Sequence, residues 1–128
     1  MQRLLLALAV ALAVISGTNG LYMITNPVGW YHAVPGVIAT GPANTHFITD
    51  IGLAYVTSMA LLLAAVWRPS QRGALAIAAA IWPALHAGFH VVGDLSAGEF
   101  AIPTTEIFGI YVPVIAQLAL GVYWSARR

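Results

Sequence analysis

The chain has 128 residues, of which 60% are hydrophobic and 7% are charged, whereas soluble domains carry about 25% charged residues. So few charges cannot cover a water-facing surface, and the mean hydropathy of +0.85 agrees. The length allows one domain. The absence of cysteine excludes disulfides and thiolate chemistry, and a net charge of +1 without a basic patch excludes a nucleic-acid interface.

Four segments are long and apolar enough to cross a bilayer, which takes roughly 20 residues each. They cover residues 4–24, 46–67, 74–95 and 105–124, and Pro83 lies inside the third. We therefore expect an all-α bundle of four transmembrane helices that forms a single integral membrane domain over residues 1–128.

The first segment also resembles the start of a secretory signal peptide, because Arg3 precedes the apolar run Leu4–Ile15. Against that interpretation, no A-x-A cleavage site follows the run, and apolar residues resume at 21–24. We predict an uncleaved first span.

The segment Asn26–Thr45 contains several prolines and glycines, which are typical of breaks in regular helix. It is predicted to contain no regular helix and to lie along the outer surface or fold back over the bundle. Asn44 is a candidate N-cap for the second span, and Thr104 or Thr105 for the fourth.

Orientation follows from the charges. All five positive charges are arginines, and they lie at the N-terminus, between the second and third spans, and at the C-terminus: Arg3, Arg68, Arg72, Arg127 and Arg128. The four acids lie toward the opposite side: Asp50, Asp94, Glu99 and Glu106. The positive-inside rule then places both termini in the cytoplasm. The compact, alanine-rich composition favours a bacterial inner membrane.

Aromatic residues near the span ends are predicted to form interfacial belts. The outer belt would contain Tyr22, Trp30, Tyr31 and Tyr111, and the inner belt Trp67, Tyr123 and Trp124.

Two polar patterns are predicted at the outer ends of neighbouring spans. His46 and Asp50 are four residues apart and share a helix face. The third span ends in a stripe with the same spacing, formed by His86, His90 and Asp94. Because the two spans are antiparallel, both patterns lie at one end of the bundle. Glu106 can join them from the fourth span, and Asp50 is expected to pair with His86 or His90.

Ionisable groups inside a bilayer cost about 2.5–3.5 kcal/mol each, so they are retained where they pair or bind something. Histidines at i, i+4 with a facing carboxylate form a recurrent metal site in helical bundles. The predicted metal ligands are His46, Asp50, His86, His90 and Asp94. Nitrogen and oxygen ligands suit copper, iron or zinc without selecting one. Asp50 and Glu106 are the predicted catalytic groups, acting on an apolar substrate unless the site only handles the metal.

Three other interpretations remain open. A haem b protein would use His46 with His86 or His90 as axial ligands, although no outer arginine or lysine would meet the propionates. A cofactor-free isomerase of a lipid or isoprenoid would use a His–Asp pair with Glu106 as acid and base. A small structural subunit of a larger membrane complex, or a homo-oligomer, would use the same network to join helices within the surrounding lipid.

Overall fold

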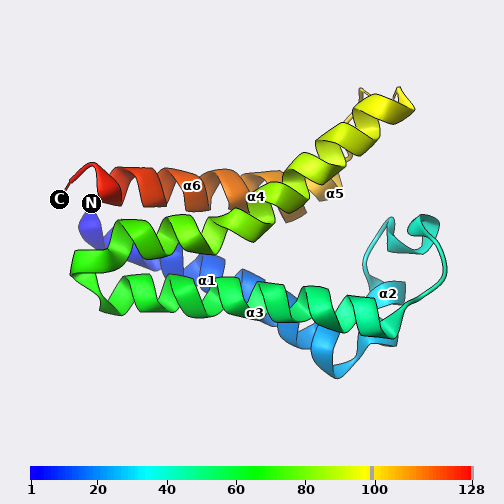
Figure 1. The fold of residues 1–128 in the computed structure, drawn as a ribbon, viewed down its shortest axis with the longest axis horizontal. Helices are drawn as coiled ribbons and strands as arrows, with labels where there is room; N and C mark the ends of the chain where they lie inside the picture. Colours follow the sequence, from blue (N-terminus) through cyan, green and yellow to red (C-terminus); the bar gives the residue numbers. More distant parts are fainter. Residues whose placement is uncertain (99, 128) are drawn as a thin grey trace.

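The computed structural model describes residues 1–98 and 100–127, so Glu99 and Arg128 lie outside the described residues. The fold is all-helical and contains four helices long and apolar enough to span a membrane, as predicted (Figure 1). The first three are α1 (Gln2–Thr25), α3 (Thr45–Trp67) and α4 (Arg72–Ala97). The fourth is composite and consists of α5 (Thr104–Glu106), a π-helical turn η3 (Ile107–Tyr111) and α6 (Val112–Ser125).

The helices run roughly lengthwise, and both termini lie at one end, here called the terminal end (Figure 1). The opposite end, which carries α2 and α5, is the loop end. Helix α1 packs against α3, and α6 packs against α4. The half of α4 nearer the loop end turns away from α3, so the bundle divides into two branches toward that end (Figure 1).

Glycines bring α1 and α3 close together. A Cβ placed on Gly20 would lie 2.6 Å from the Gly52 carbonyl oxygen, and one on Gly52 would lie 2.8 Å from the Gly20 carbonyl oxygen. Small residues permit this approach of two backbones, which is the usual association mode of helices in lipid. Between this crossing and the terminal end, all four spanning helices contribute to one apolar core, which includes Ala9, Leu62 and Leu120.

The bend in α4 has an identifiable cause. Pro83 has no N–H and leaves the carbonyl of Ala79 without its intrahelical donor. The hydroxyl of Ser58 on α3 donates to that carbonyl at 2.8 Å, in a buried contact. A membrane helix tolerates proline when a neighbouring side chain replaces the missing bond in this way. The proline thus bends α4 and also fixes where α3 contacts it.

The connection between the first two spans contains a short helix, α2 (Pro27–Ala33), which corrects the prediction of no regular helix there. Asn26 caps it by accepting from the Gly29 N–H at 3.0 Å, and Pro27 occupies the first turn. Proline suits that position because its fixed φ is helical and its missing N–H has no partner to lose. The residues interpreted as helix breakers therefore start a helix.

The same connection folds back onto the bundle, which is one of the two predicted arrangements. The indole Nε1–H of Trp30 donates to the side-chain oxygen of Asn19 at 2.9 Å. The hydroxyl of Tyr31, which is buried, donates to the carbonyl of Gly41 at 2.6 Å. These bonds tie α2 and the loop after it to the end of α1.

One predicted cap is confirmed and the other is wrong. Asn44 accepts from the Phe47 N–H at 3.1 Å and starts α3. The fourth span begins instead after Pro103, whose carbonyl accepts from Glu106 and Ile107, and no side chain caps it. Thr104 and Thr105 are the first two residues of α5, inside its first turn, so neither occupies the N-cap position.

Candidate functional site

The predicted site residues divide between the two branches of the loop end. His46 and Asp50 lie on α3, whereas His86, His90 and Asp94 lie on α4. Because α4 turns away from α3 beyond Pro83, the two groups do not form one cluster (Figure 1). Sequence spacing placed both at one end of the bundle correctly, but the bend separates them laterally.

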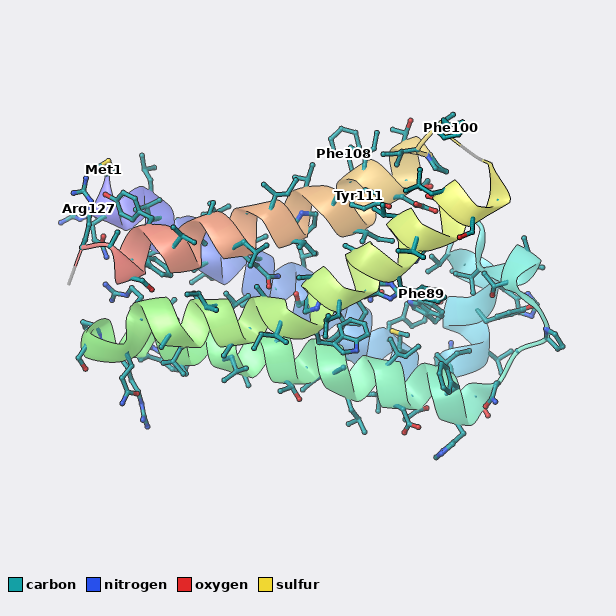
Figure 2. All side chains as sticks on the ribbon, turned by 45° about the horizontal axis from the view of Figure 1, so that its top comes forward. Met1, Phe89, Phe100, Phe108, Tyr111 and Arg127 are labelled. Carbon is teal, nitrogen blue, oxygen red and sulfur yellow. The ribbon has the colours of Figure 1, made fainter. Side chains whose placement is uncertain are left out.

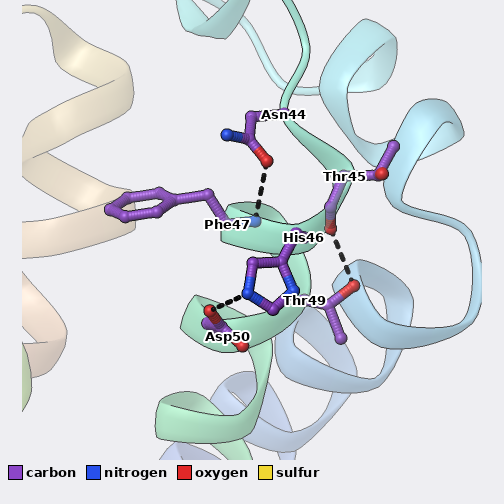
Figure 3. A network of polar contacts seen from close by, with 6 residues as sticks. All are labelled: Asn44, Thr45, His46, Phe47, Thr49 and Asp50. Atoms are coloured by element: carbon purple, nitrogen blue, oxygen red, sulfur yellow. Dashed lines mark hydrogen bonds and ion pairs between the residues drawn. The ribbon is translucent and has the colours of Figure 1, made fainter.

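On α3, His46 and Asp50 pair with each other (Figure 3). His46 Nε2 lies 3.4 Å from Asp50 Oδ2, and the two side chains are 88% and 53% exposed. The partner of Asp50 is therefore its own helical neighbour rather than His86 or His90. An exposed i, i+4 pair of this kind adds at most a few tenths of a kcal/mol.

On the other branch, His90 and Glu106 join α4 to α5. His90 Nδ1 lies 3.4 Å from Glu106 Oε1, and the side chains are only 28% and 22% exposed. Glu106 therefore does join the polar groups from the fourth span, with a partner on the third. This pair links two helices and is largely withdrawn from the surroundings.

Two further polar atoms lie buried near this pair. Glu106 Oε2 and the Tyr111 hydroxyl have no hydrogen-bond partner among the described residues. Buried polar groups are nearly always hydrogen-bonded, so each unpaired one calls for an explanation such as a ligand, a water or a catalytic role. Figure 2 shows Tyr111 between the fourth span, to which it belongs, and α4.

A cavity of about 120 Å³ adjoins the Tyr111 side chain, whereas Glu106 and His90 are not part of its lining. Its polar lining comes from Asp94 and Tyr111, and its apolar lining from Val91, Leu95, Phe100 and Ile102. A water molecule occupies about 30 Å³ in the liquid. The cavity therefore has room for a few waters or for part of an alkyl chain, with polar groups on one side.

The π-helical turn explains why Glu106 and Tyr111 both face this region. In an α-helix of 3.6 residues per turn, residues five apart point about 140° away from each other. In η3, the Val112 N–H bonds to the Ile107 carbonyl, an i→i+5 pattern that brings residues five apart onto one face. Tyr111 accordingly lines the same cavity as Asp94. Such turns are rare and often occur at functional sites.

A series of aromatic contacts runs from Tyr55 on α3 to His90 on α4. Tyr55 on α3 meets Trp82 edge-on at 4.9 Å between centroids. Trp82 stacks on His86 at 5.1 Å with a 9° interplanar angle, and His86 meets His90 edge-on at 4.8 Å. These ring contacts hold His86 and His90 in place along α4.

Sequence reasoning missed Tyr55, Trp82 and Tyr111 as parts of this region. The i, i+4, i+8 spacing of Trp82, His86 and His90 was a signal that could have identified Trp82. Tyr111 was interpreted as a residue of the outer belt. Its role depends on η3, for which the sequence offers only the weak sign of Pro113 just after it.

The predicted metal ligands form no group of three or more His, Asp or Glu side chains within the part of the chain that the structure describes. The nearest approach to one lies on α4 and α5, at His86, His90, Asp94 and Glu106. The axial pair for haem would have to join His46 with a histidine of the other branch. The metal and the haem thus stay predictions.

No model of a protein family matches this chain, and no curated protein or solved structure is significantly similar to it.

Proposed function

We propose that this multi-pass membrane protein carries an acid–base site for proton transfer on an apolar, bilayer-dissolved molecule such as a lipid or isoprenoid. The observation that supports it is the partly buried His90–Glu106 pair, whose second carboxylate oxygen has no partner among the described residues. A carboxylate held by one oxygen and unpaired at the other is suited to accept a proton from a neighbouring molecule.

The residues would divide the reaction as follows. Glu106 Oε2 removes a proton from a carbon next to a double bond, and the electron pair of that C–H bond moves the double bond by one position. The proton is returned to the far carbon of the shifted system, so no oxidant or reductant is needed. His90 holds Glu106 through Oε1, and the Tyr111 hydroxyl can donate to charge that develops on the substrate. Asp50 lies on the other branch and takes no step.

The cavity that Tyr111 and Asp94 line favours an apolar substrate. Four of the six residues that line the cavity are hydrophobic: Val91, Leu95, Phe100 and Ile102. All four are exposed on the surface of the chain, on the branch that turns away from α3. A molecule dissolved in the bilayer could therefore reach the cavity from the side without crossing water.

Solvent deuterium provides a direct test. Protein reconstituted with a total bacterial lipid extract in D₂O should place deuterium on carbon in one lipid class, detected by mass spectrometry. Glu106→Gln should abolish the incorporation, because the amide cannot accept the proton, and His90→Gln should reduce it at least about a hundredfold. The matched control is Asp50→Asn, which alters the exposed pair and should keep full activity. No incorporation by the wild-type protein, or equal incorporation by all variants, would contradict the proposal.

A second candidate is a divalent metal site on the same branch. Its support is a chain of pairwise contacts on this branch, in which His90 lies against both Glu106 and His86. Elemental analysis of the purified wild-type protein and its variants distinguishes the metal site from the cofactor-free acid–base site. Stoichiometric copper, iron or zinc that is retained by Asp50→Asn and lost in His90→Gln would establish the metal site in place of the cofactor-free one.

We further propose that the terminal end faces the cytoplasm of a bacterial inner membrane. The support is that every described arginine, including Arg68 and Arg72, lies at that end, as the positive-inside rule requires. A C-terminal fusion to alkaline phosphatase should be inactive and one to green fluorescent protein should fluoresce. The reverse result would invert the orientation.

A further inference from the structure

A second cavity lies at the terminal end, at the far end of the molecule from Glu106. Its volume is about 540 Å³. Its lining combines residues from the start of α1, the α3–α4 turn and the end of α6: Gln2, Pro69, Ser70, Arg72, Tyr123, Trp124 and Arg127. The lining contains two guanidinium groups, an amide, two hydroxyls and an indole, and no carboxylate. That chemistry fits an anion.

Arg72 is held in place before any ligand arrives. Its Nε–H donates to the Ala65 carbonyl at 2.9 Å, and its Nη2 donates to the Val66 carbonyl at 3.0 Å. The guanidinium also lies 5.4 Å from the centre of the Trp124 ring. A guanidinium has five N–H donors, so two bonds leave three available. Arg72 therefore presents a fixed positive charge with free donors.

Arg127 is similarly positioned by an aromatic ring. Its guanidinium carbon lies 4.6 Å from the centre of the Tyr123 ring, in cation–π contact. Because α6 carries Tyr123 and Trp124 in succession, the two arginines stack on adjacent rings of one helix end. The acids Asp50, Asp94 and Glu106 lie toward the loop end, and the described residues show no salt bridge to either arginine.

Trp124 adds a separate indication that the site is incomplete. Sequence reasoning assigned it to an interfacial belt, where a tryptophan would be exposed, as Trp67 is at 74%. Trp124 is instead 7% exposed, and its Nε1–H has no acceptor among the described residues. Buried indole N–H groups usually find a partner. An anion in the adjoining cavity is a candidate acceptor for that N–H.

We infer that this cavity binds a phosphate group, and that the phosphate belongs to the headgroup of an anionic lipid. The ends of four apolar spans meet there, so the cavity lies at the depth where lipid headgroups begin. Basic sites between membrane helices recognise anionic headgroups through paired charge and hydrogen bonds. This site is independent of the proposed proton-transfer site.

Native mass spectrometry of the full chain in neutral detergent tests the inference with three probes: phosphatidylglycerol, phosphatidylcholine and inorganic phosphate. The wild-type protein should bind one phosphatidylglycerol more tightly than phosphatidylcholine, and inorganic phosphate at the same concentration should neither bind nor compete. Arg127→Gln should weaken phosphatidylglycerol binding about tenfold, the effect of losing one charge-assisted hydrogen bond. Arg127 makes no bond to the backbone of another helix in the described contacts, so this variant should fold normally.

The matched control is Arg68→Gln, which removes an arginine at the same end that does not line the cavity. It should leave binding within twofold of the wild type. Equal weakening by both variants would show that only the total charge matters and would overturn the inference. Inorganic phosphate binding as tightly as the lipid would assign the cavity to free phosphate and would overturn the lipid assignment. Trp124→Phe, which removes only the N–H donor, should also weaken binding, and an unchanged affinity would exclude Trp124 from the site.

Discussion

The two ends of this bundle use opposite kinds of contact. Toward the terminal end, small buried residues such as Ala76 and Gly73 let the helices pack closely around one core. Toward the loop end, α4 leaves α3 beyond Pro83, and the ionisable groups divide into an exposed pair and a partly buried pair. One end is therefore a single apolar core, whereas the other presents ionisable side chains on two separate branches. The small, buried residues hold the frame from which the polar branch projects.

The largest expected effect is on the contact between α1 and α3. In Gly52→Leu, the added Cβ alone would lie 2.8 Å from the Gly20 carbonyl oxygen and 2.9 Å from the Met23 Cβ. Backbone atoms cannot move aside cheaply, so we expect a loss of about 3 kcal/mol of unfolding free energy or a failure to fold. The measurement is thermal unfolding in detergent, followed by size-exclusion chromatography.

Gly88→Leu is the matched control, because a Cβ at Gly88 meets no other atom within 4 Å. It should leave stability unchanged or raise it by up to about 1 kcal/mol through helix propensity. If the two leucine variants were equally unstable, the close crossing of α1 and α3 would not be the feature that holds the frame.

The next effect concerns the point where the branches separate. Ser58→Ala removes the side-chain donor to the Ala79 carbonyl and should cost about 1 kcal/mol. In a Pro83→Ala background the residue at position 83 regains its N–H and can donate to the same carbonyl. Ser58→Ala should then cost close to nothing. A double-mutant cycle of unfolding free energies measures this coupling, and strictly additive effects would contradict the account of the bend.

Pro83→Ala should also change the geometry of the loop end. A straighter α4 would continue alongside α3, so the distance between the two branches should shorten. The chain has no cysteine, so spin labels can be placed at Phe47→Cys and Phe89→Cys, two exposed positions on α3 and α4. Pulsed electron–electron double resonance should report a shorter distance between the two spin labels in the Pro83→Ala variant than in the protein with proline. An unchanged distance would assign the bend to another cause.

The sequence predicted well what depends on local spacing and on apolar length. The four spans, the Asn44 cap and the shared helix face of His46 and Asp50 each follow from a few neighbouring residues. The assembly of the candidate site depends on the direction in which α4 bends and on the π-helical turn before α6. Neither leaves a periodic pattern in the sequence. The bend arises from one missing backbone hydrogen bond at Pro83, and the π-helical turn from a backbone hydrogen bond shifted by one residue. Hence the pairing of Asp50 with α4 was wrong, while Glu106 did meet His90.

The smallest expected effect is that of His46→Gln, and it contrasts with His90→Gln in the other histidine–carboxylate pair of the loop end. Both pairs have the same 3.4 Å separation, so distance alone predicts equal contributions. Exposure predicts otherwise: an exposed pair contributes at most about 0.5 kcal/mol, whereas removing one partner from a partly buried pair leaves the other in a poor environment. His46→Gln should therefore be nearly silent in unfolding measurements, and His90→Gln should cost about 1–2 kcal/mol. If His46→Gln proved the more damaging of the two, the pair on α3 would be the one that stabilises the loop end, and burial would not be what distinguishes the two pairs.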